Sequence, residues 1–143
     1  MSLLSLPGRR PSNLGVSHGR LRPCPSSPNC VCSDSEDAAH SIAPFILAVP
    51  AEKAWAAARQ AVAELPRTAI VTEDPQFLHA ECRSALLGFV DDLELHLRPA
   101  EGRIAVRSAS RLGHSDLGVN RRRVEQLRSV LRARGVLSSE PSR

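Results

Sequence analysis

The sequence predicts an α+β fold: an antiparallel sheet of about five strands with two helices packed on one face, preceded by an extended arm. Segments in which apolar residues alternate with polar ones recur between residues 68 and 110, as they do in half-buried strands. Two other segments, 51–65 and 120–134, carry apolar residues at the spacing of one helical face. The expected order is therefore strand, helix, four strands, helix.

The length of the chain suits one domain. Its 143 residues, 42% of them hydrophobic, are enough for one modest core and too few for two. Residues 1–37 are rich in Pro, Ser, Gly and Arg and have no apolar periodicity, so we expect an extended arm there. The single α+β domain is expected over 38–137, and a frayed tail over 138–143.

The first expected strand covers 41–49, an apolar stretch with branched residues in which Pro44 favours a position at the sheet edge. A helix should follow over 51–65. Pro50 suits the start of a helix, and Pro66 prevents the helix from continuing.

Four strands are expected after this helix. The first two, over 68–72 and 77–83, are joined by the turn EDPQ, and the last two form a hairpin around the turn RPAEG. Only one register of the hairpin buries the apolar residues of both strands, because a shift by one position would expose a whole set. That register pairs Leu97 with Ile104, Leu95 with Val106, Leu93 with Ser108, and Asp91 with Ser110.

The same register sets Glu94 opposite Arg107 on the other face of the hairpin, which we expect to face outward. An opposite-charge pair across two strands contributes about 0.2–1 kcal/mol, so this pair is expected to be structural. His79 and His96 alternate with solvent-facing residues and are interpreted as surface histidines.

The last helix is expected to begin near Asn120, which could cap it, as could Asp116 slightly earlier. Gly135 is placed to end it. Its apolar stripe consists of Val124, Leu127 and Leu131.

Three consecutive arginines, at 121–123, lie in the first turn of this helix, where the helix dipole favours acids over bases by about 0.3–1 kcal/mol each. An anion such as phosphate or a carboxylate, held by backbone N–H groups and guanidinium groups, would explain them. The alternative is an internal salt-bridge network in which Asp91, Asp92 and Asp116 neutralise the arginines.

Three of the four cysteines, Cys24, Cys30 and Cys32, lie within nine residues. Their spacing lacks the paired C-x-x-C of a zinc ribbon, so we expect no metal site, although His40 or Cys82 could complete one. Cys24 and Cys30 could instead fill small apolar gaps where the arm packs. A disulfide between these two is the third possibility, and it would be unexpected without an export signal.

The net charge is +4, and every basic residue except Lys53 is an arginine, which favours bidentate contacts with carboxylates or phosphates. Aromatic residues make up only 3% of the chain and no RNA- or DNA-binding motif is present, so we expect no specific nucleic-acid partner. The first ten residues are too short and too broken for a signal peptide, and no apolar run approaches the roughly 20 residues of a spanning helix. We therefore expect no membrane span and a cytoplasmic location.

Four long motifs stand out in the sequence: RRPSNLGV, PCPSSPNCV, GFVDD and RSASRLGHSDLGVNRRRVEQLR. They resemble the domain-of-unknown-function 1499 family of bacterial and plant proteins. The resemblance implies a small α+β domain and brings no established activity, cofactor or catalytic residue, so no cofactor is expected. The strand order and the run PFILAVPAEKAWAAARQAV also resemble the START-like helix-grip fold, whose members enclose apolar ligands between sheet and helix.

Two positions depart from the family pattern. Cys32 stands where the family usually has serine, which weakens a three-cysteine metal site. His114 stands where an aromatic residue is common, which weakens a histidine mechanism.

These features predict a non-catalytic domain that binds a small anionic ligand or an acidic partner segment at a polar cluster. The cluster consists of Asp91, Asp92, Arg107, Ser108, Ser110, Arg111, Asp116, Asn120 and Arg121. One alternative is a hydrolase-like enzyme that uses Asp91 or His114 as base, with arginines stabilising an anionic transition state. The other is a structural or interaction protein whose arginine network only supports the fold.

Overall fold

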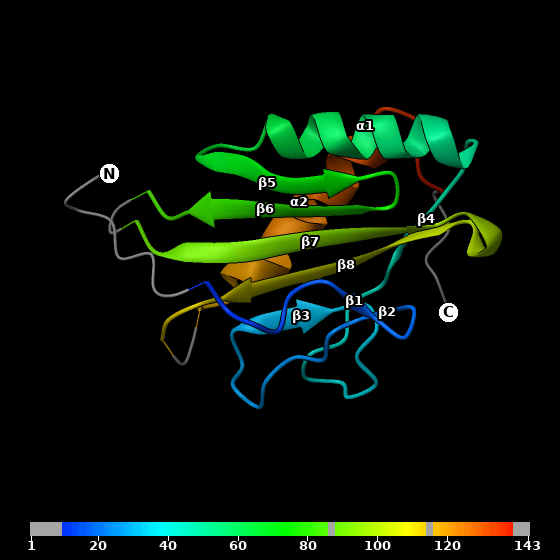
Figure 1. Cartoon of the computed structure of the whole chain (residues 1–143). Helices are drawn as coiled ribbons and strands as arrows, with labels where there is room; N and C mark the ends of the chain where they lie inside the picture. The colour runs from blue at the N-terminus through cyan, green and yellow to red at the C-terminus, as the bar shows by residue number, and fades with distance from the viewer. Residues whose placement is uncertain (1–9, 86–87, 114–115, 139–143) are drawn as a thin grey trace.

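The computed structural model describes residues 10–85, 88–113 and 116–138 (Figure 1). Its main sheet has six strands, each antiparallel to its partner, in the order β3-β8-β7-β6-β5, with β4 also paired to β8. The strands are β3 (Cys30–Cys32), β4 (Phe45–Ile46), β5 (Thr68–Asp74), β6 (Phe77–Arg83), β7 (Val90–Arg98) and β8 (Arg103–Ser110). A separate hairpin precedes them, formed by β1 (Val16–Ser17) and β2 (Arg20–Leu21).

Two helices, α1 (Ala51–Ala63) and α2 (Val119–Ala133), pack on one face of this sheet. Figure 1 shows α2 crossing behind the strands and α1 lying beside β5. Most of the buried α1 residues are alanines, which lets the helix lie close to the strands. The α+β class and the placement of both helices were predicted correctly.

The hairpin of β7 and β8 has the predicted register. Leu97 pairs with Ile104 and Leu95 with Val106, and all four side chains belong to the core. A short 3-10 turn, Pro99–Glu101, connects the two strands, and Gly102 completes the connection with a φ of 63° in the left-handed region.

The first predicted strand, over 41–49, is shorter than expected. Only Phe45 and Ile46 pair with β8, because Pro44 has no N–H group and the residues after Ile46 bond elsewhere. Leu47 donates its backbone N–H group to the carbonyl of Gly102. The edge position that Pro44 indicated is correct, since β3 and β4 lie along the same side of β8.

The arm is not simply extended. Cys30–Cys32 form β3 at the edge of the main sheet, which the sequence did not predict because three residues carry too little periodicity. The preceding residues fold over the face of the sheet opposite to the helices, where Leu21, Cys32 and Ala105 form a small buried cluster. In Figure 1 this blue segment passes in front of the lower strands.

The covered face corrects two expectations. Glu94 and Arg107 were expected on an outward face, but they are 0% and 1% exposed because the arm lies over them. His79 was interpreted as a surface residue and is also buried, whereas His96 is half-buried. The alternation of side chains along a strand shows which residues share a face of the sheet. It does not show whether a segment distant in sequence covers the face opposite to the helices.

Candidate functional site

The nine residues predicted to form one site lie on both faces of the sheet. Asp91 and Asp92 are consecutive in β7, so their side chains point to opposite faces. Asp91 pairs with Ser110 on the helix side, whereas Asp92 pairs with Ala109 on the arm side. The single predicted cluster is therefore two clusters, and the sheet separates them.

The first group, which we name the helix-face cluster, joins the start of α2 to the end of β8. Its members are Asp91, Ser108, Ser110, Asp116, Asn120 and Arg123. Asn120 is fully buried, and its amide nitrogen donates to Ser110 Oγ and to Asp116 Oδ2, both at 2.8 Å. Ser108 Oγ donates to the Asn120 amide oxygen at 2.7 Å.

Each charge in this cluster has a partner. Arg123 Nη2 lies 2.8 Å from Asp91 Oδ2, and Arg123 Nη1 donates to Asn120 Oδ1. Asp116 accepts the backbone N–H groups of Gly118 and Asn120 from two residues before the N-cap. The N-cap of α2 is Gly118 and Asn120 lies within the helix, so the prediction that Asn120 or Asp116 caps the helix is wrong. Burial opposes ionisation of Asp116, but these hydrogen bonds, with that of the Asn120 side chain, hold its pKa below the ordinary value.

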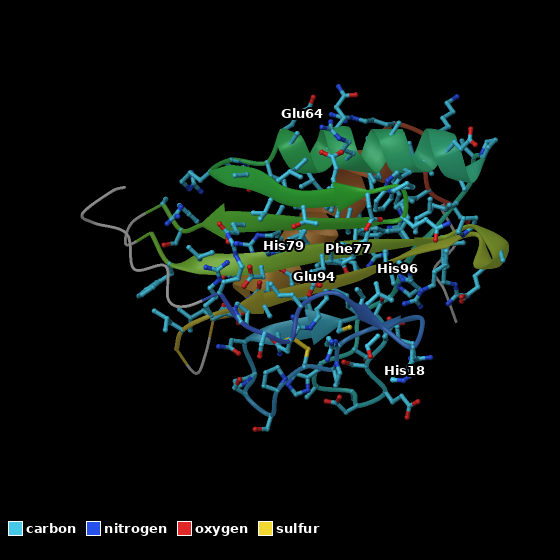
Figure 2. The ribbon with its side chains drawn as sticks, viewed as in Figure 1. His18, Glu64, Phe77, His79, Glu94 and His96 are labelled. Atoms are coloured by element: carbon cyan, nitrogen blue, oxygen red, sulfur yellow. A yellow bond between two sulfur atoms is a disulfide. The ribbon has the colours of Figure 1, made fainter. Side chains whose placement is uncertain are left out.

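The second group, the arm-face network, lies under the N-terminal arm. Its members are His79, Glu81, Asp92, Glu94, Arg107 and Arg111. Figure 2 shows His79 and Glu94 on neighbouring strands of this face, and the two residues are register partners across β6 and β7.

Asp92 is the best-connected acid of the network. His79 Nε2 lies 2.7 Å from Asp92 Oδ1, and Arg111 donates from Nε and Nη2 to the two carboxylate oxygens, both at 2.8 Å. Burial raises the pKa of Asp92, but the bonds from Arg111 and His79 outweigh it and lower the pKa. Arg111 also pairs with Glu81, to which Arg10 of the arm donates at 2.7 Å.

Glu94 and Arg107 form a more isolated pair, with 3.3 Å between Glu94 Oε1 and Arg107 Nη1. The backbone N–H group of Gly15 donates to the other Glu94 oxygen at 2.6 Å. Burial nevertheless raises the pKa of Glu94. Arg107 Nε is buried and has no hydrogen-bond partner within the described part of the chain, so this guanidinium is only partly satisfied.

The arm-face network is a poor candidate for a metal site. Ligand atoms of His79, Glu81 and Asp92 lie within 4.8 Å of one another, close enough to hold a cation. The carboxylates of Glu81 and Asp92 are, however, already neutralised by Arg111 and Arg10. A cation would have to displace both guanidinium groups, so the geometry suits an ion-pair network.

The cysteines form no metal site either. Cys24 and Cys30 are joined by a disulfide, which was one of the three possibilities left open by the sequence. Cys32 and Cys82 are free and buried, and burial raises the pKa of both thiols. His40, the other candidate ligand, is held by Asp37 and by the Ser27 carbonyl.

A third group of residues lies at the end of the sheet where α1 meets β5, β6 ends and α2 begins. We name it the loop-end pocket, a hollow of about 200 Å³. It is lined by Leu65, Pro66, Arg67, Thr68, Cys82, Arg83, Val119, Arg122, Arg123 and Gln126. Four of these residues are arginines, and none is acidic.

The arginines of the pocket differ in their partners. Arg123 is paired with Asp91. Arg67 and Arg122 donate only to backbone carbonyls, those of Arg83 and Leu117, and within the described ranges neither lies within 4.0 Å of a carboxylate. Arg121 faces another small hollow, which it lines together with Asp116.

Sequence reasoning found the arginines of α2 but missed Arg67 and Arg83. These two precede and follow strands that are distant in sequence, and no local motif joins them. It also missed His79 and Glu81 as partners of Asp92. Both residues lie on the face of β6 that continues into the face of β7 carrying Asp92 and Glu94. The alternation along the two strands could therefore have predicted that these four side chains lie together.

The hydrolase alternative named Asp91 or His114 as base. The Asp91 carboxylate is occupied by its ion pair with Arg123. His114 lies outside the described residues.

Among the described residues, no helix combines the length and the apolar character needed to cross a bilayer. No curated protein and no solved structure matches the chain, so the helix-grip likeness stays a prediction. The model of one family, described as protein of unknown function (DUF1499), matches residues 20–131. Because this match spans well over half of the 143 residues, the chain belongs to the DUF1499 family.

Proposed function

We propose that this protein binds a small anion, such as phosphate or a small carboxylate, in the loop-end pocket. The observation that carries the proposal is that Arg67 and Arg122 have no carboxylate partner among the described residues, in a hollow whose described lining includes no acid. The two positively charged guanidinium groups repel each other, and an anion bound between them is attracted to both. Guanidinium groups offer paired N–H donors that match the oxygens of phosphate and carboxylate.

The size of the pocket suits a small ligand. Its volume of about 200 Å³ is below the roughly 300–1,000 Å³ of pockets that enclose drug-sized molecules. Gln126 adds a neutral donor at its wall, whereas the Thr68 hydroxyl already donates to the Pro66 carbonyl at 3.0 Å.

The proposal moves the anion site away from all nine residues that the sequence suggested, since none of them lines the loop-end pocket. Arg107 and Arg111 are neutralised by Glu94, Asp92 and Glu81, and they lie under the arm. These residues fit the structural alternative, in which ion pairs support the fold.

The test is thermal unfolding with increasing phosphate, at an ionic strength kept constant with sodium chloride. A ligand at ten times its Kd stabilises by about 1.4 kcal/mol, which corresponds to a Tm rise of about 4 °C for a domain of this size. We expect Arg67→Ala and Arg122→Ala to lose this rise.

Two variants serve as controls. Arg132→Ala removes an exposed charge of the same type from the other end of α2 and should keep the rise. Arg111→Ala should lower the starting Tm and also keep the rise. If phosphate fails to stabilise the wild type, or stabilises the pocket variants equally, the proposal is wrong.

A cytoplasmic location also stays a proposal. The Cys24–Cys30 disulfide counts against it, because the cytosol of most organisms keeps thiols reduced. Thiol titration of the protein isolated under alkylating conditions would decide whether the bond exists in the cell.

A further inference from the structure

Large apolar side chains are exposed together at the end of the sheet that carries the loop-end pocket. Within the described ranges, the exposed large apolar residues are Val16, Val71, Phe89, Leu112, Leu117 and Val119. The last four line one shallow hollow of about 220 Å³, together with Ser84, Ser110, Gly113 and two acids, Asp91 and Asp116. Single exposed apolar residues are ordinary, whereas a contiguous group marks a surface that binds something.

The most exposed of these residues, Leu117, is 83% exposed, and Leu112 is 47% exposed. The turn that carries Leu117 is well defined, because Asp116 accepts the backbone N–H groups of Gly118 and Asn120. Leu117 has a φ of 54°, in the left-handed region that asparagine or glycine would adopt more easily. The fold thus exposes most of a leucine side chain at a backbone conformation that favours other residues.

This apolar surface borders directly on the arginines of the loop-end pocket. Val119 lines both hollows. Arg122 Nη1 donates to the Leu117 carbonyl at 2.8 Å, so the guanidinium lies beside the turn that exposes the leucine. Arg67 and Arg122 have no carboxylate partner among the described residues. Of the two acids in the apolar hollow, Asp91 is paired with Arg123, and Asp116 accepts hydrogen bonds from Gly118 and Asn120. The surface therefore combines apolar side chains with the positive charge of two arginines that no described carboxylate neutralises.

We propose that this end of the protein docks on the surface of an anionic lipid bilayer. Phe89, Leu112 and Leu117 enter the headgroup region, and Arg67 and Arg122 contact lipid phosphates. Apolar residues flanked by arginines are the combination that holds a protein at such an interface. The described ends of α1, β6 and β8 lie at the same end of the sheet, at the left of Figure 1, so one plane can meet them.

Charge complementarity favours a bilayer over the other possible occupants. A second copy docked through the same surface would bring the two sets of arginines together, since a two-fold interface pairs a patch with itself. An acidic peptide is the remaining competitor, and the experiment includes it.

The inference rests on the proposed function only for its arginines, and vesicle co-sedimentation of the full chain tests it separately. Two vesicle types are compared: pure phosphatidylcholine, and a mixture with 30% phosphatidylglycerol. We expect binding to the anionic vesicles alone, decreasing as sodium chloride is added. A soluble poly-glutamate competitor at equal charge should not displace the protein.

The decisive variant is Leu112→Ser/Leu117→Ser, for which we expect at least a tenfold loss of vesicle affinity and an unchanged response to phosphate. Val71→Ser, which removes an exposed valine from β5, is the matched control and should bind like the wild type. Arg122→Ala should weaken both vesicle binding and the phosphate response.

Three results would overturn the inference: no binding to anionic vesicles, equal binding to both vesicle types, or full binding by the double leucine variant. Displacement by poly-glutamate would do the same and would assign the surface to an acidic protein partner. Loss of the phosphate response in the wild type, with vesicle binding intact, would contradict the proposed function and leave the docking surface in place.

Discussion

The arm-face network and the loop-end pocket hold the same residue type in opposite situations. Under the arm, Arg107 and Arg111 are buried beside Glu94, Asp92 and Glu81. At the end of the sheet, Arg67 and Arg122 are exposed and have only backbone carbonyls as partners among the described residues. Arginines whose charge is already neutralised support the fold, and those left with net charge are the ones available to a ligand.

The largest expected effect tests the buried side of this comparison. Arg107→Ala should lower the free energy of unfolding by about 3 kcal/mol, because it leaves Glu94 buried without its cation. Urea unfolding measures this change. The double variant Glu94→Leu/Arg107→Met should recover most of the loss, since it removes both charges. A single variant as stable as the wild type would mean that the pair contributes nothing.

The disulfide is expected to have the next largest effect. Replacing Cys24 and Cys30 by serine should lower the free energy of unfolding by about 2 kcal/mol, the value for so short a loop in the chain-entropy description. The loss of stability should be confined to the arm. Hydrogen exchange should therefore become faster in β3, while the phosphate response of the loop-end pocket stays the same. A reducing agent should affect the wild type and leave the double variant unchanged.

Acid should weaken the arm-face network in particular. The pKa values of Asp92 and Glu81 are lowered: burial opposes the shift, and hydrogen bonds from arginines outweigh it. A lowered folded-state pKa stabilises the protein above the ordinary values of 3.8 for Asp and 4.5 for Glu, and this stability is lost as pH falls through the folded values.

Glu94, whose pKa is raised by burial, acts in the opposite direction and offsets part of the loss. The urea concentration at the unfolding midpoint, measured at pH values between 3 and 7, should therefore decrease once the pH is below about 4.5. Asp92→Asn should flatten this dependence. A wild-type midpoint that is constant down to pH 3 would contradict the assignment of these ion pairs.

The smallest expected effect is at the loop-end pocket. Arg67→Ala and Arg122→Ala should change the free energy of unfolding by no more than about 0.5 kcal/mol, because neither side chain is buried or paired with an acid within the described part of the chain. Together with the result for Arg107→Ala, this measurement shows whether paired and unpaired arginines differ in their contribution to the free energy of unfolding. A loss of several kcal/mol would show that these arginines also support the fold.

Much of the sheet was predictable because its signals are local. The pairing of Leu97 with Ile104 and of Glu94 with Arg107 follows from the alternation of a few residues around one turn. The start of α1 followed from Pro50 and the end of α2 from Gly135, each of which acts within one turn of the chain. The N-cap of α2 was not predicted, because it is Gly118 and neither Asn120 nor Asp116.

The candidate site was predicted less well. Nine residues were placed in one cluster because they are close in sequence, yet Asp91 and Asp92 lie on opposite faces. The hairpin register already contained this separation. The separation of the two aspartates could have been predicted from the sequence, since consecutive strand residues point to opposite faces of a sheet.

The amino-acid sequence alone determined the α+β class, the hairpin register and the concentration of arginine at the start of the last helix. Periodicity and turn residues act over a few positions, so they can be read without knowing the fold. Tertiary structure decided which arginines are neutralised. That depends on contacts such as Gly15 with Glu94 and Asp34 with Arg98, which join residues 79 and 64 positions apart. Residues so distant leave no repeating pattern in the chain, and only the packing of the arm against the sheet brings them together.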